Sequence, residues 1–359
     1  MAADADKERK MKAAVLHAPG VIKCEEVPIP RLIDGEALVK VKAAGVCGSD
    51  IRRVMVTGTY HFPTIPGHEF AGEVVEVAGE AGNVRPGDRV VVIPLIPCGR
   101  CDFCRVGDYA LCDDYDYLGS RTDGGFAEYV KAPARNLIPI PDGVDYETAA
   151  ATEPAAVALH GLRRARIEPG DSLAVLGAGP IGVLVAQWAR ALGAKAVYLV
   201  DTVEEKLELA KRLDFLPENC IDAGKADPIQ AIKDRTGGRG VSLVVEAAGV
   251  PATLKGSLEI AGKGGRVLLL GNPQEDVTLP AKLISGILRK QLTLCGTWNS
   301  EFRPYPVNEW KLTLDFMARG LIKVLPLISH RFSLEDVAEA FDMMYHRRQV
   351  FNRVFFIPG

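Results

Sequence analysis

The stretch SLAVLGAGPIGVLVAQWARALGAKAVYLVD, residues 172–201, constrains the fold of this 359-residue chain more than any other part. It reads as an apolar strand, a glycine-rich turn, an amphipathic helix and a second apolar strand, which together make the βαβ unit of a parallel sheet. Later segments continue the strand pattern: VSLVVEAAG, GRVLLLGN and QLTLCGTW. The sequence therefore predicts a doubly wound α/β domain of the Rossmann type over residues 155–297.

The turn of this βαβ unit matches G-x-G-x-x-G. A bare glycine pattern is a weak signal, but here a strand precedes it, a helix follows it, and an acidic residue, Asp201, ends the next strand roughly 20 residues on. Such a carboxylate accepts hydrogen bonds from the ribose of NAD and repels the 2′-phosphate of NADP, although it could also be an ordinary helix cap. The prediction is an NAD site formed by Gly177, Gly179, Pro180, Ile181, Gly182 and Asp201.

Four of the eight cysteines lie in PCGRCDFCRVGDYALC, residues 97–112, with the spacing C-x2-C-x2-C-x7-C. Disulfides are uncommon in cytosolic proteins, so metal binding is the better interpretation. An iron–sulfur cluster is the alternative, but the ferredoxin run has three residues and then a proline where this chain has seven and Asp113. We predict a structural zinc held by Cys98, Cys101, Cys104 and Cys112, which leaves no open position for chemistry.

Upstream, residues 12–92 read as short strands with Gly and Pro turns, which is typical of a small β-barrel. Three residues in this part are of the kinds that bind zinc: Cys47, His68 and Glu69. Each also has a plainer interpretation, as a buried apolar residue, a turn histidine and a surface carboxylate. Only their combination indicates a second metal site.

Composition excludes several classes of function. The chain is 48% hydrophobic and 25% charged with a net charge of −3, and it has neither a membrane-length apolar segment nor a basic run typical of nucleic-acid binding. The N-terminal MAADADKERK does not resemble a signal or transit peptide. We therefore expect a cytoplasmic protein of two domains that acts on small molecules, not on nucleic acids or membranes.

The order of these motifs resembles the zinc-containing medium-chain dehydrogenases, and within them the polyol branch that includes sorbitol and threonine dehydrogenases. The shared motifs are CGSD at 47–50, GHEFAG at 67–72, GDRV at 87–90, the four-cysteine segment, Glu153-Pro154 and the glycine turn. The resemblance implies a GroES-like β-barrel catalytic domain made of residues 1–154 and 298–359, with the Rossmann domain inserted between them. It places the active site in the cleft.

The resemblance also implies roles for single residues. Cys47 and His68 are expected to bind a catalytic zinc, with Asp50 orienting the imidazole. Glu153 takes the position where many alcohol dehydrogenases have a second cysteine, and Glu69 lies near it. Either glutamate could bind the metal directly while the other holds its water or exchanges with it, so this choice stays open. The expectation is two zinc ions per chain, one catalytic and one structural.

The implied reaction is oxidation of a secondary alcohol to a ketone, with NAD accepting the hydride. Ser49 is the expected first member of a proton relay, although it could be a turn serine, and Arg52 stands where many relatives have a relay histidine. Arg53 and Arg121 are candidates to hold a substrate phosphate, with a solvated surface as the plainer interpretation of each.

The substrate class is a polyol or a sugar-alcohol phosphate. A free hexitol, pentitol, cyclitol or amino alcohol such as threonine is the alternative, and a non-catalytic binding protein on the same fold is the alternative from another class. Relatives pair through the edge strand of the Rossmann sheet, for which QLTLCGTW is the candidate, so we expect a homodimer or a homotetramer.

Overall fold

The computed structural model describes residues 9–80, 82, 84–273 and 275–359. All but the last two residues of the N-terminal MAADADKERK therefore lie outside the described part of the chain. The rest divides into two compact units. Among the described residues, those up to Glu153 form the first unit with Phe302–Ala318 and Ile328–Gly359, and the second unit comprises those of Pro154–Glu301 and Arg319–Leu327.

Two short segments that the sequence placed in the C-terminal part of the catalytic domain group with the second unit instead: 298–301 and 319–327. Hydrogen bonds account for the later segment. The side-chain amide of Gln187 accepts from the backbone N–H of Lys323 at 2.7 Å and donates to its carbonyl at 3.1 Å. These two hydrogen bonds fix the segment to the helix of the second unit that contains Gln187, Pro180–Ala191.

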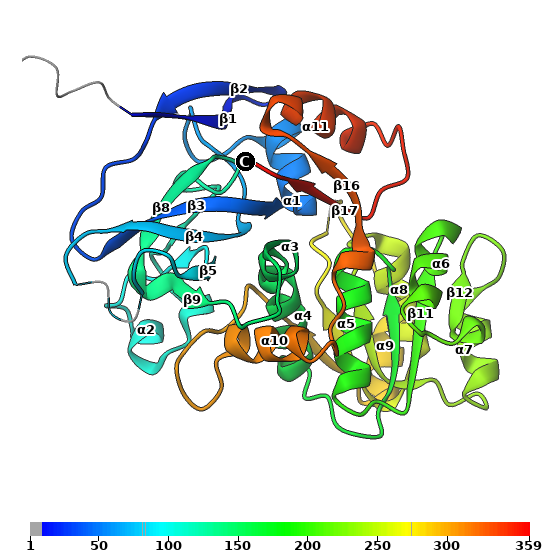
Figure 1. Cartoon of the computed structure of the whole chain (residues 1–359). Helices are drawn as coiled ribbons and strands as arrows, with labels where there is room; N and C mark the ends of the chain where they lie inside the picture. The colour runs from blue at the N-terminus through cyan, green and yellow to red at the C-terminus, as the bar shows by residue number, and fades with distance from the viewer. Residues whose placement is uncertain (1–8, 81, 83, 274) are drawn as a thin grey trace, which may run out of the picture. The chain divides into compact units, whose positions relative to one another are not determined.

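The first unit is built on a seven-stranded sheet (Figure 1). Its main order is β16-β17-β3-β4-β5-β9, and β8 also pairs with β3. The strands are β3 (Glu36–Gly45), β4 (Glu69–Val77), β5 (Arg89–Val92), β8 (Tyr129–Pro133), β9 (Leu137–Pro139), β16 (Ile328–Phe332) and β17 (Arg353–Phe356). Because β17 pairs antiparallel with β3, the end of the chain completes a sheet that the first 140 residues begin.

The first unit also contains shorter strands and several helices, of which α3 (Tyr146–Ala150) contacts β3 and β4. Apolar side chains from both ends of the sequence form its core, including Phe70, Phe126, Phe341 and Phe356. The elements are β1 (Lys10–Ala18), β2 (Val21–Pro28), β6 (Leu95–Ile96), β7 (Asp116–Tyr117), α1 (Gly48–Arg52), α2 (Asp102–Val106), α3 (Tyr146–Ala150), α10 (Glu309–Ala318) and α11 (Val337–Tyr345), with α4 (Thr152–Arg164) beginning here.

The second unit contains a six-stranded sheet in which every pairing is parallel. The strand order is β12-β11-β10-β13-β14-β15, which confirms the predicted doubly wound Rossmann architecture. The strands are β10 (Ser172–Leu176), β11 (Ala196–Asp201), β12 (Cys220–Asp222), β13 (Val241–Glu246), β14 (Ala261–Leu269) and β15 (Thr293–Gly296). The helices are α5 (Pro180–Ala191), α6 (Glu204–Arg212), α7 (Pro228–Arg235), α8 (Pro251–Ile260) and α9 (Ala281–Lys290).

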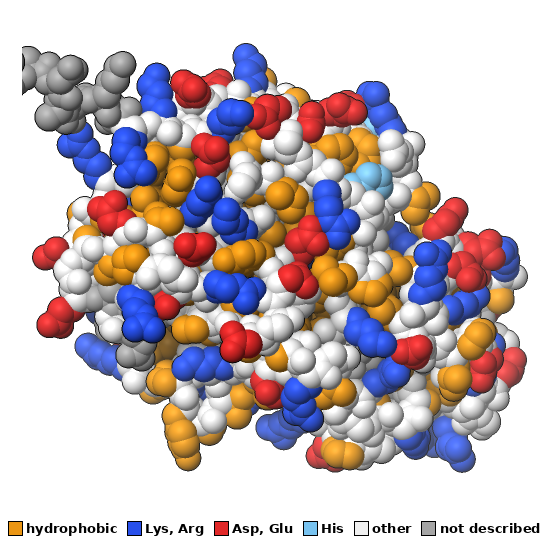
Figure 2. All heavy atoms as spheres, viewed as in Figure 1, with side chains coloured by type: hydrophobic (Ala, Val, Ile, Leu, Met, Phe, Trp, Pro, Cys, Tyr) orange, Lys and Arg blue, Asp and Glu red, His pale blue; other side chains and the backbone are white. Residues whose placement is uncertain are grey.

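The surface is mixed in charge. Figure 2 shows basic and acidic side chains interspersed over the face drawn, with apolar groups between them. Within the described ranges, no helix has both the length and the apolar character needed to cross a bilayer.

Candidate active site and metal centres

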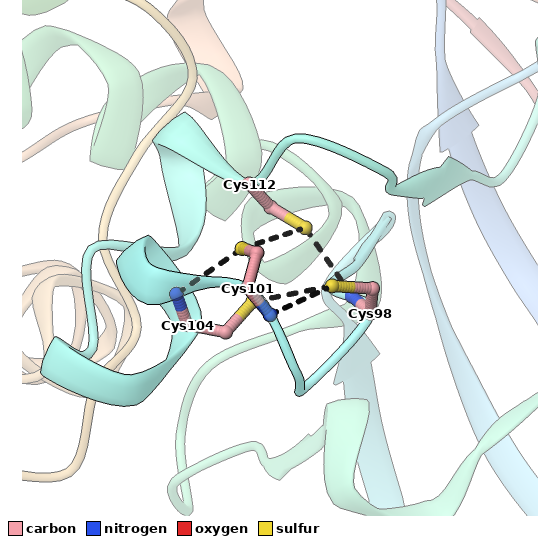
Figure 3. Close-up of side chains that lie close together, drawn as sticks. All are labelled: Cys98, Cys101, Cys104 and Cys112. Carbon is pink, nitrogen blue, oxygen red and sulfur yellow. Dashed lines mark hydrogen bonds between the residues drawn. The ribbon is translucent and has the colours of Figure 1, made fainter.

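The four clustered cysteines converge on one point in the first unit. Cys101 caps the N-terminus of α2, Cys104 lies within that helix, and the flanking segments bring in Cys98 and Cys112 (Figure 3). The Sγ atoms of Cys98 and Cys104 are 3.9 Å apart, as are those of Cys101 and Cys112. A disulfide needs about 2.05 Å between sulfurs, and all eight cysteines are free.

This geometry fits a zinc ion. Four thiolates placed about 2.3 Å from a tetrahedral Zn²⁺ lie about 3.8 Å from one another, close to the observed separation. Backbone N–H groups also point at the sulfurs: that of Cys101 donates to Cys98 Sγ at 3.4 Å, and that of Cys104 donates to Cys101 Sγ at 3.4 Å. The N–H groups of Arg100 and Cys101 lower the pKa of Cys98 to about 6, which favours its thiolate. Burial, in contrast, raises the pKa of Cys104 to about 12 and also raises that of Cys112. A bound cation would have to offset the burial of these two thiolates.

A second group of possible ligands forms where β3 ends and β4 begins. Cys47 follows β3, His68 precedes β4 and Glu69 is its first residue. The antiparallel pairing sets Gly45 opposite Glu69, so the two ends meet. Ligand atoms of Cys47, His68 and Glu69 all lie within 4.8 Å of one another.

Asp50 contacts two of these possible ligands, His68 and Cys47. Asp50 is fully buried. Its Oδ1 lies 3.2 Å from His68 Nδ1, in a contact between charged groups that does not meet the geometry of a hydrogen bond. Its Oδ2 accepts a hydrogen bond from the backbone N–H of Cys47 at 3.1 Å. Burial alone would raise the pKa of Asp50, but His68 and Arg53 reverse the shift and lower it. A charged Asp50 therefore holds both the cysteine backbone and the imidazole in place.

The two glutamates have different partners. Glu69 forms a buried ion pair with Arg353 of β17. Glu153, in the first turn of α4, accepts a hydrogen bond from the Tyr117 hydroxyl at 3.2 Å, and burial raises its pKa to about 7. Glu153 does not belong to the tight group of Cys47, His68 and Glu69. Arg353 and Tyr117 were not predicted, because no motif or spacing marks either residue.

The remaining predicted residues of the first unit lie around α1 and β7. Ser49 and Arg52 are exposed on α1. Arg53 Nη1 donates to Asp50 Oδ1 at 3.0 Å, so the positive charge of Arg53 is paired with the Asp50 carboxylate. Arg121 follows β7, and its Cζ lies 4.5 Å from the ring centroid of Tyr60 and 4.5 Å from that of Tyr115.

In the second unit the glycine turn has the geometry that its sequence requires. Gly177 has φ of 108°, and a Cβ on Gly182 would lie 1.9 Å from the Gly177 carbonyl oxygen, so the turn and α5 pack too closely for side chains. No described atom lies within 4 Å of a Cβ built on Gly179. Pro180 and Ile181 then begin α5. The space beside Gly179 is open to a ligand.

Asp201 ends β11 and faces this turn. Its Oδ2 accepts from the backbone N–H of Ala178 at 2.8 Å, and its Oδ1 accepts from that of Val203 at 3.0 Å. The carboxylate thus ties the glycine turn to the end of β11. Each oxygen still has capacity for a second hydrogen bond.

Comparison with known families identifies the class of the protein. Residues 33–142 match the alcohol dehydrogenase GroES-like domain, and residues 180–319 match the zinc-binding dehydrogenase family. The chain belongs to the zinc-containing medium-chain alcohol dehydrogenases, which confirms the predicted family, its GroES-like and Rossmann folds, and its class of activity.

Individual relatives include polyol dehydrogenases and an L-threonine 3-dehydrogenase of Bacillus velezensis, which is 34% identical over 97% of this chain and 99% of that protein. The chain is 36% identical to galactitol 1-phosphate 5-dehydrogenase of Escherichia coli K12 over 92% of this chain and 95% of that protein, and 34% identical to sorbitol dehydrogenase of Bacillus subtilis over 93% of each. The crystal structure of the E. coli galactitol-1-phosphate dehydrogenase matches with a TM-score of 0.91, at 35% identity, over 97% of this chain and 100% of that one. A zinc-binding dehydrogenase from Sinorhizobium meliloti, bound to NADP, matches with a TM-score of 0.89, at 34% identity, over 98% and 100%.

Proposed function

We propose that this protein oxidises a secondary hydroxyl of a polyol or sugar-alcohol phosphate, of the galactitol 1-phosphate kind, to a ketone and transfers the hydride to NAD. The convergence of Cys47, His68 and Glu69 over a buried Asp50 carries the proposal, because it supplies one open metal site in a chain of this family. The similarity to galactitol 1-phosphate 5-dehydrogenase supports the choice of substrate class.

Two zinc ions per chain fit the donor groups. The four cysteines would hold a structural zinc, and Cys47, His68 and one glutamate would hold a catalytic zinc with a coordination position left open. The grouping of ligand atoms favours Glu69 over Glu153 as the third ligand. When bound, this zinc would act as a Lewis acid toward the substrate oxygen.

The residues of the chain orient the ligands and move the proton. Asp50 fixes the imidazole of His68 so that the opposite ring nitrogen faces the metal site. Ser49 Oγ would take the proton of the substrate hydroxyl and pass it outward, because a hydroxyl both accepts and donates. The guanidinium of Arg52 offers donors and no acceptor, so it does not replace a relay histidine, but Ser49 is itself exposed, so solvent can complete the path.

The cofactor site would lie at the glycine turn of the second unit. Gly177, Gly179 and Gly182, with Pro180 and Ile181 at the start of α5, offer the pyrophosphate a helix N-terminus and open space. The free lone pairs of Asp201 would accept the ribose hydroxyls. The S. meliloti relative is described with NADP, whereas the charge of Asp201 in this chain favours NAD.

We also propose that the protein is a homodimer or a homotetramer built of such dimers. β15 is an edge strand of the sheet, and its Leu294 is 43% exposed. The preceding helix α9 contains no buried residue, and its Leu288 is 72% exposed. An uncovered strand edge with apolar neighbours is suited to pairing with a second copy.

The test is NADH formation by zinc-loaded protein with paired phosphorylated and free polyols, galactitol 1-phosphate among them, together with zinc content on the same sample. Activity on the phosphorylated member with two zinc ions per chain is the expected result. Activity confined to free polyols would favour the second candidate, a sorbitol-type dehydrogenase, which the 34% identity to sorbitol dehydrogenase supports. Loss of activity in both sets would contradict the proposal.

A further inference from the structure

We propose that Arg121, with Thr122 beside it, is the residue that recognises the phosphate group of the substrate, and that Arg53 is not. This inference rests on the proposed oxidation of a polyol phosphate and names the part of the chain that would make the enzyme specific for it. The two arginines are equal candidates by sequence, but their surroundings differ in charge.

Arg53 is already neutralised. Its Nη1 donates to Asp50 Oδ1 at 3.0 Å, and Asp50 is fully buried and also faces His68. Moving this guanidinium to a substrate phosphate would leave a buried carboxylate short of a partner, which is costly. Arg53 is therefore a positioning residue for Asp50.

The guanidinium of Arg121 is held by aromatic rings instead. Its Cζ lies 4.5 Å from the ring centroid of Tyr60 and 4.5 Å from that of Tyr115. No hydrogen bond or ion pair joins this guanidinium to another described residue. Stacking on the faces restricts the side chain while leaving the N–H edge available, and that edge is the part that binds phosphate oxygens in pairs.

The surroundings of Arg121 offer space and a second donor. Arg121 and Thr122 both line a cavity of about 630 Å³ whose lining does not include Cys47, His68 or Glu69, so the phosphate and the reacting hydroxyl would occupy separate places. The Thr122 hydroxyl is buried without a hydrogen-bond partner among the described residues.

Three carboxylates line the same cavity, those of Glu36, Asp116 and Asp123, and none of them pairs with Arg121 in the described structure. Asp123 Oδ1 accepts the backbone N–H of Ile65 at 2.9 Å, and Glu36 pairs with Lys131 at 3.2 Å. A phosphate here would meet one unpaired cation and one unused hydroxyl.

A row of rings connects Arg121 to the metal-binding group. The ring centroids of His68 and Tyr117 are 5.7 Å apart, those of Tyr117 and Tyr115 are 6.3 Å apart, and Arg121 stacks on Tyr115. The backbone N–H of Arg121 also donates to the Tyr117 carbonyl at 2.9 Å. The cation is thus fixed to the same short segment that presents the Tyr117 hydroxyl to Glu153.

The experiment compares zinc-loaded wild type with R121Q, T122V and the control R85Q, using galactitol 1-phosphate and galactitol. Arg85 is an exposed arginine in a turn of the same unit, it belongs to neither group of metal ligands, and among the described residues it pairs with Asp88. We expect R121Q to raise KM for galactitol 1-phosphate about 10- to 100-fold, the loss typical of bonds to a charged group, with kcat little changed. T122V should raise it less, and R85Q should leave it unchanged.

Galactitol distinguishes recognition from structural damage. Its KM should be the same in R121Q and wild type, and an equal rise for both polyols would overturn the inference, as would an unaffected KM for galactitol 1-phosphate. Inorganic phosphate should compete with galactitol 1-phosphate in wild type and not in R121Q. If phosphate instead inhibits through Arg121 without competing, the anion site is separate from the substrate and the assignment fails.

Failure of the proposed function is recognised separately. If wild type oxidises neither polyol, calorimetry with galactitol 1-phosphate still decides the inference. Binding that is lost in R121Q and kept in R85Q would support the phosphate site, whereas equal binding by all three proteins would overturn it.

Discussion

Arg353 and Glu69 form a buried ion pair although 284 positions separate them in the sequence. Their side chains are 2% and 1% exposed, so neither charge is compensated by water. The pair exists because β17, near the end of the chain, is added to the sheet next to β3, and β3 also pairs with β4, whose first residue is Glu69. It joins the proposed metal site to the C-terminal strand.

Replacing Arg353 with Met should therefore destabilise the first unit. The change leaves a buried carboxylate without its partner, and breaking a buried pair in this way costs about 3–5 kcal/mol. Urea unfolding of the zinc-loaded protein, followed by fluorescence, measures the difference. An unfolding free energy equal to that of wild type would show that water or the metal replaces Arg353.

Gly45 should be as sensitive as the ion pair it adjoins. A Cβ at this position would lie 2.5 Å from Arg353 Nη2 and 2.7 Å from Glu69 Oε2, whereas a Cβ on nearby Gly48 would meet no described atom within 4 Å. Gly45→Ala should lower the unfolding free energy by about 1–3 kcal/mol, as overpacking does in cores. Gly48→Ala is the matched control, and similar losses in both variants would refute the steric explanation.

The sequence predicted those parts of the site whose residues lie close together along the chain, and it missed contacts between residues that are far apart in the sequence. The four cysteines lie within one short segment, and the glycine turn belongs to one βαβ unit, so local spacing was enough to predict both. Arg353 and Tyr117 contact the glutamates only through the tertiary fold, and neither belongs to a motif. Local patterns could not separate Arg53 from Arg121 either, because the difference lies in Asp50 and in two tyrosine rings.

Removing one ligand of the four-cysteine cluster should remove one zinc per chain. Cys98→Ser weakens a site in which metal binding contributes directly to folding, so both the zinc content and the thermal midpoint should fall. Cys220→Ser, in β12, is the control because Cys220 lies outside both ligand groups. Metal analysis gives the result, and an unchanged stoichiometry would disprove a zinc at this cluster.

Replacing Asp201 should change the choice of cofactor. Asp201→Gly removes the charge that would repel a 2′-phosphate, so the ratio of kcat/KM for NADP to that for NAD should rise, on the order of 10-fold or more. It also removes two acceptors of backbone N–H groups, so kcat/KM for NAD should fall. Asp201→Asn is the comparison, because it removes the negative charge but keeps a polar side chain of similar size. An unaltered preference for NAD in both variants would mean that other residues recognise the ribose.

A pH-dependent contribution to stability is expected from Asp171 in the second unit. Its carboxylate accepts from Arg266 Nη2 at 2.6 Å and from the Ser242 hydroxyl at 2.7 Å, and its side chain is only 10% exposed. Burial alone would raise the pKa of Asp171, but hydrogen bonds from the Glu168 backbone, Ser242 and Arg266 outweigh it and lower the pKa.

Because the pKa of Asp171 is lower in the folded state, its contribution to stability is complete above the pKa of the unfolded chain and is lost as the pH falls through the lower, folded pKa. Asp171→Asn should cost about 2 kcal/mol at pH 7, and the difference from wild type should shrink near pH 3. Asp171 belongs to neither group of metal ligands, so any loss of zinc in acid should affect both proteins alike, and the difference in their unfolding free energies isolates Asp171. A difference that stays constant between pH 7 and pH 3 would show that packing, and not charge, accounts for the effect of this residue.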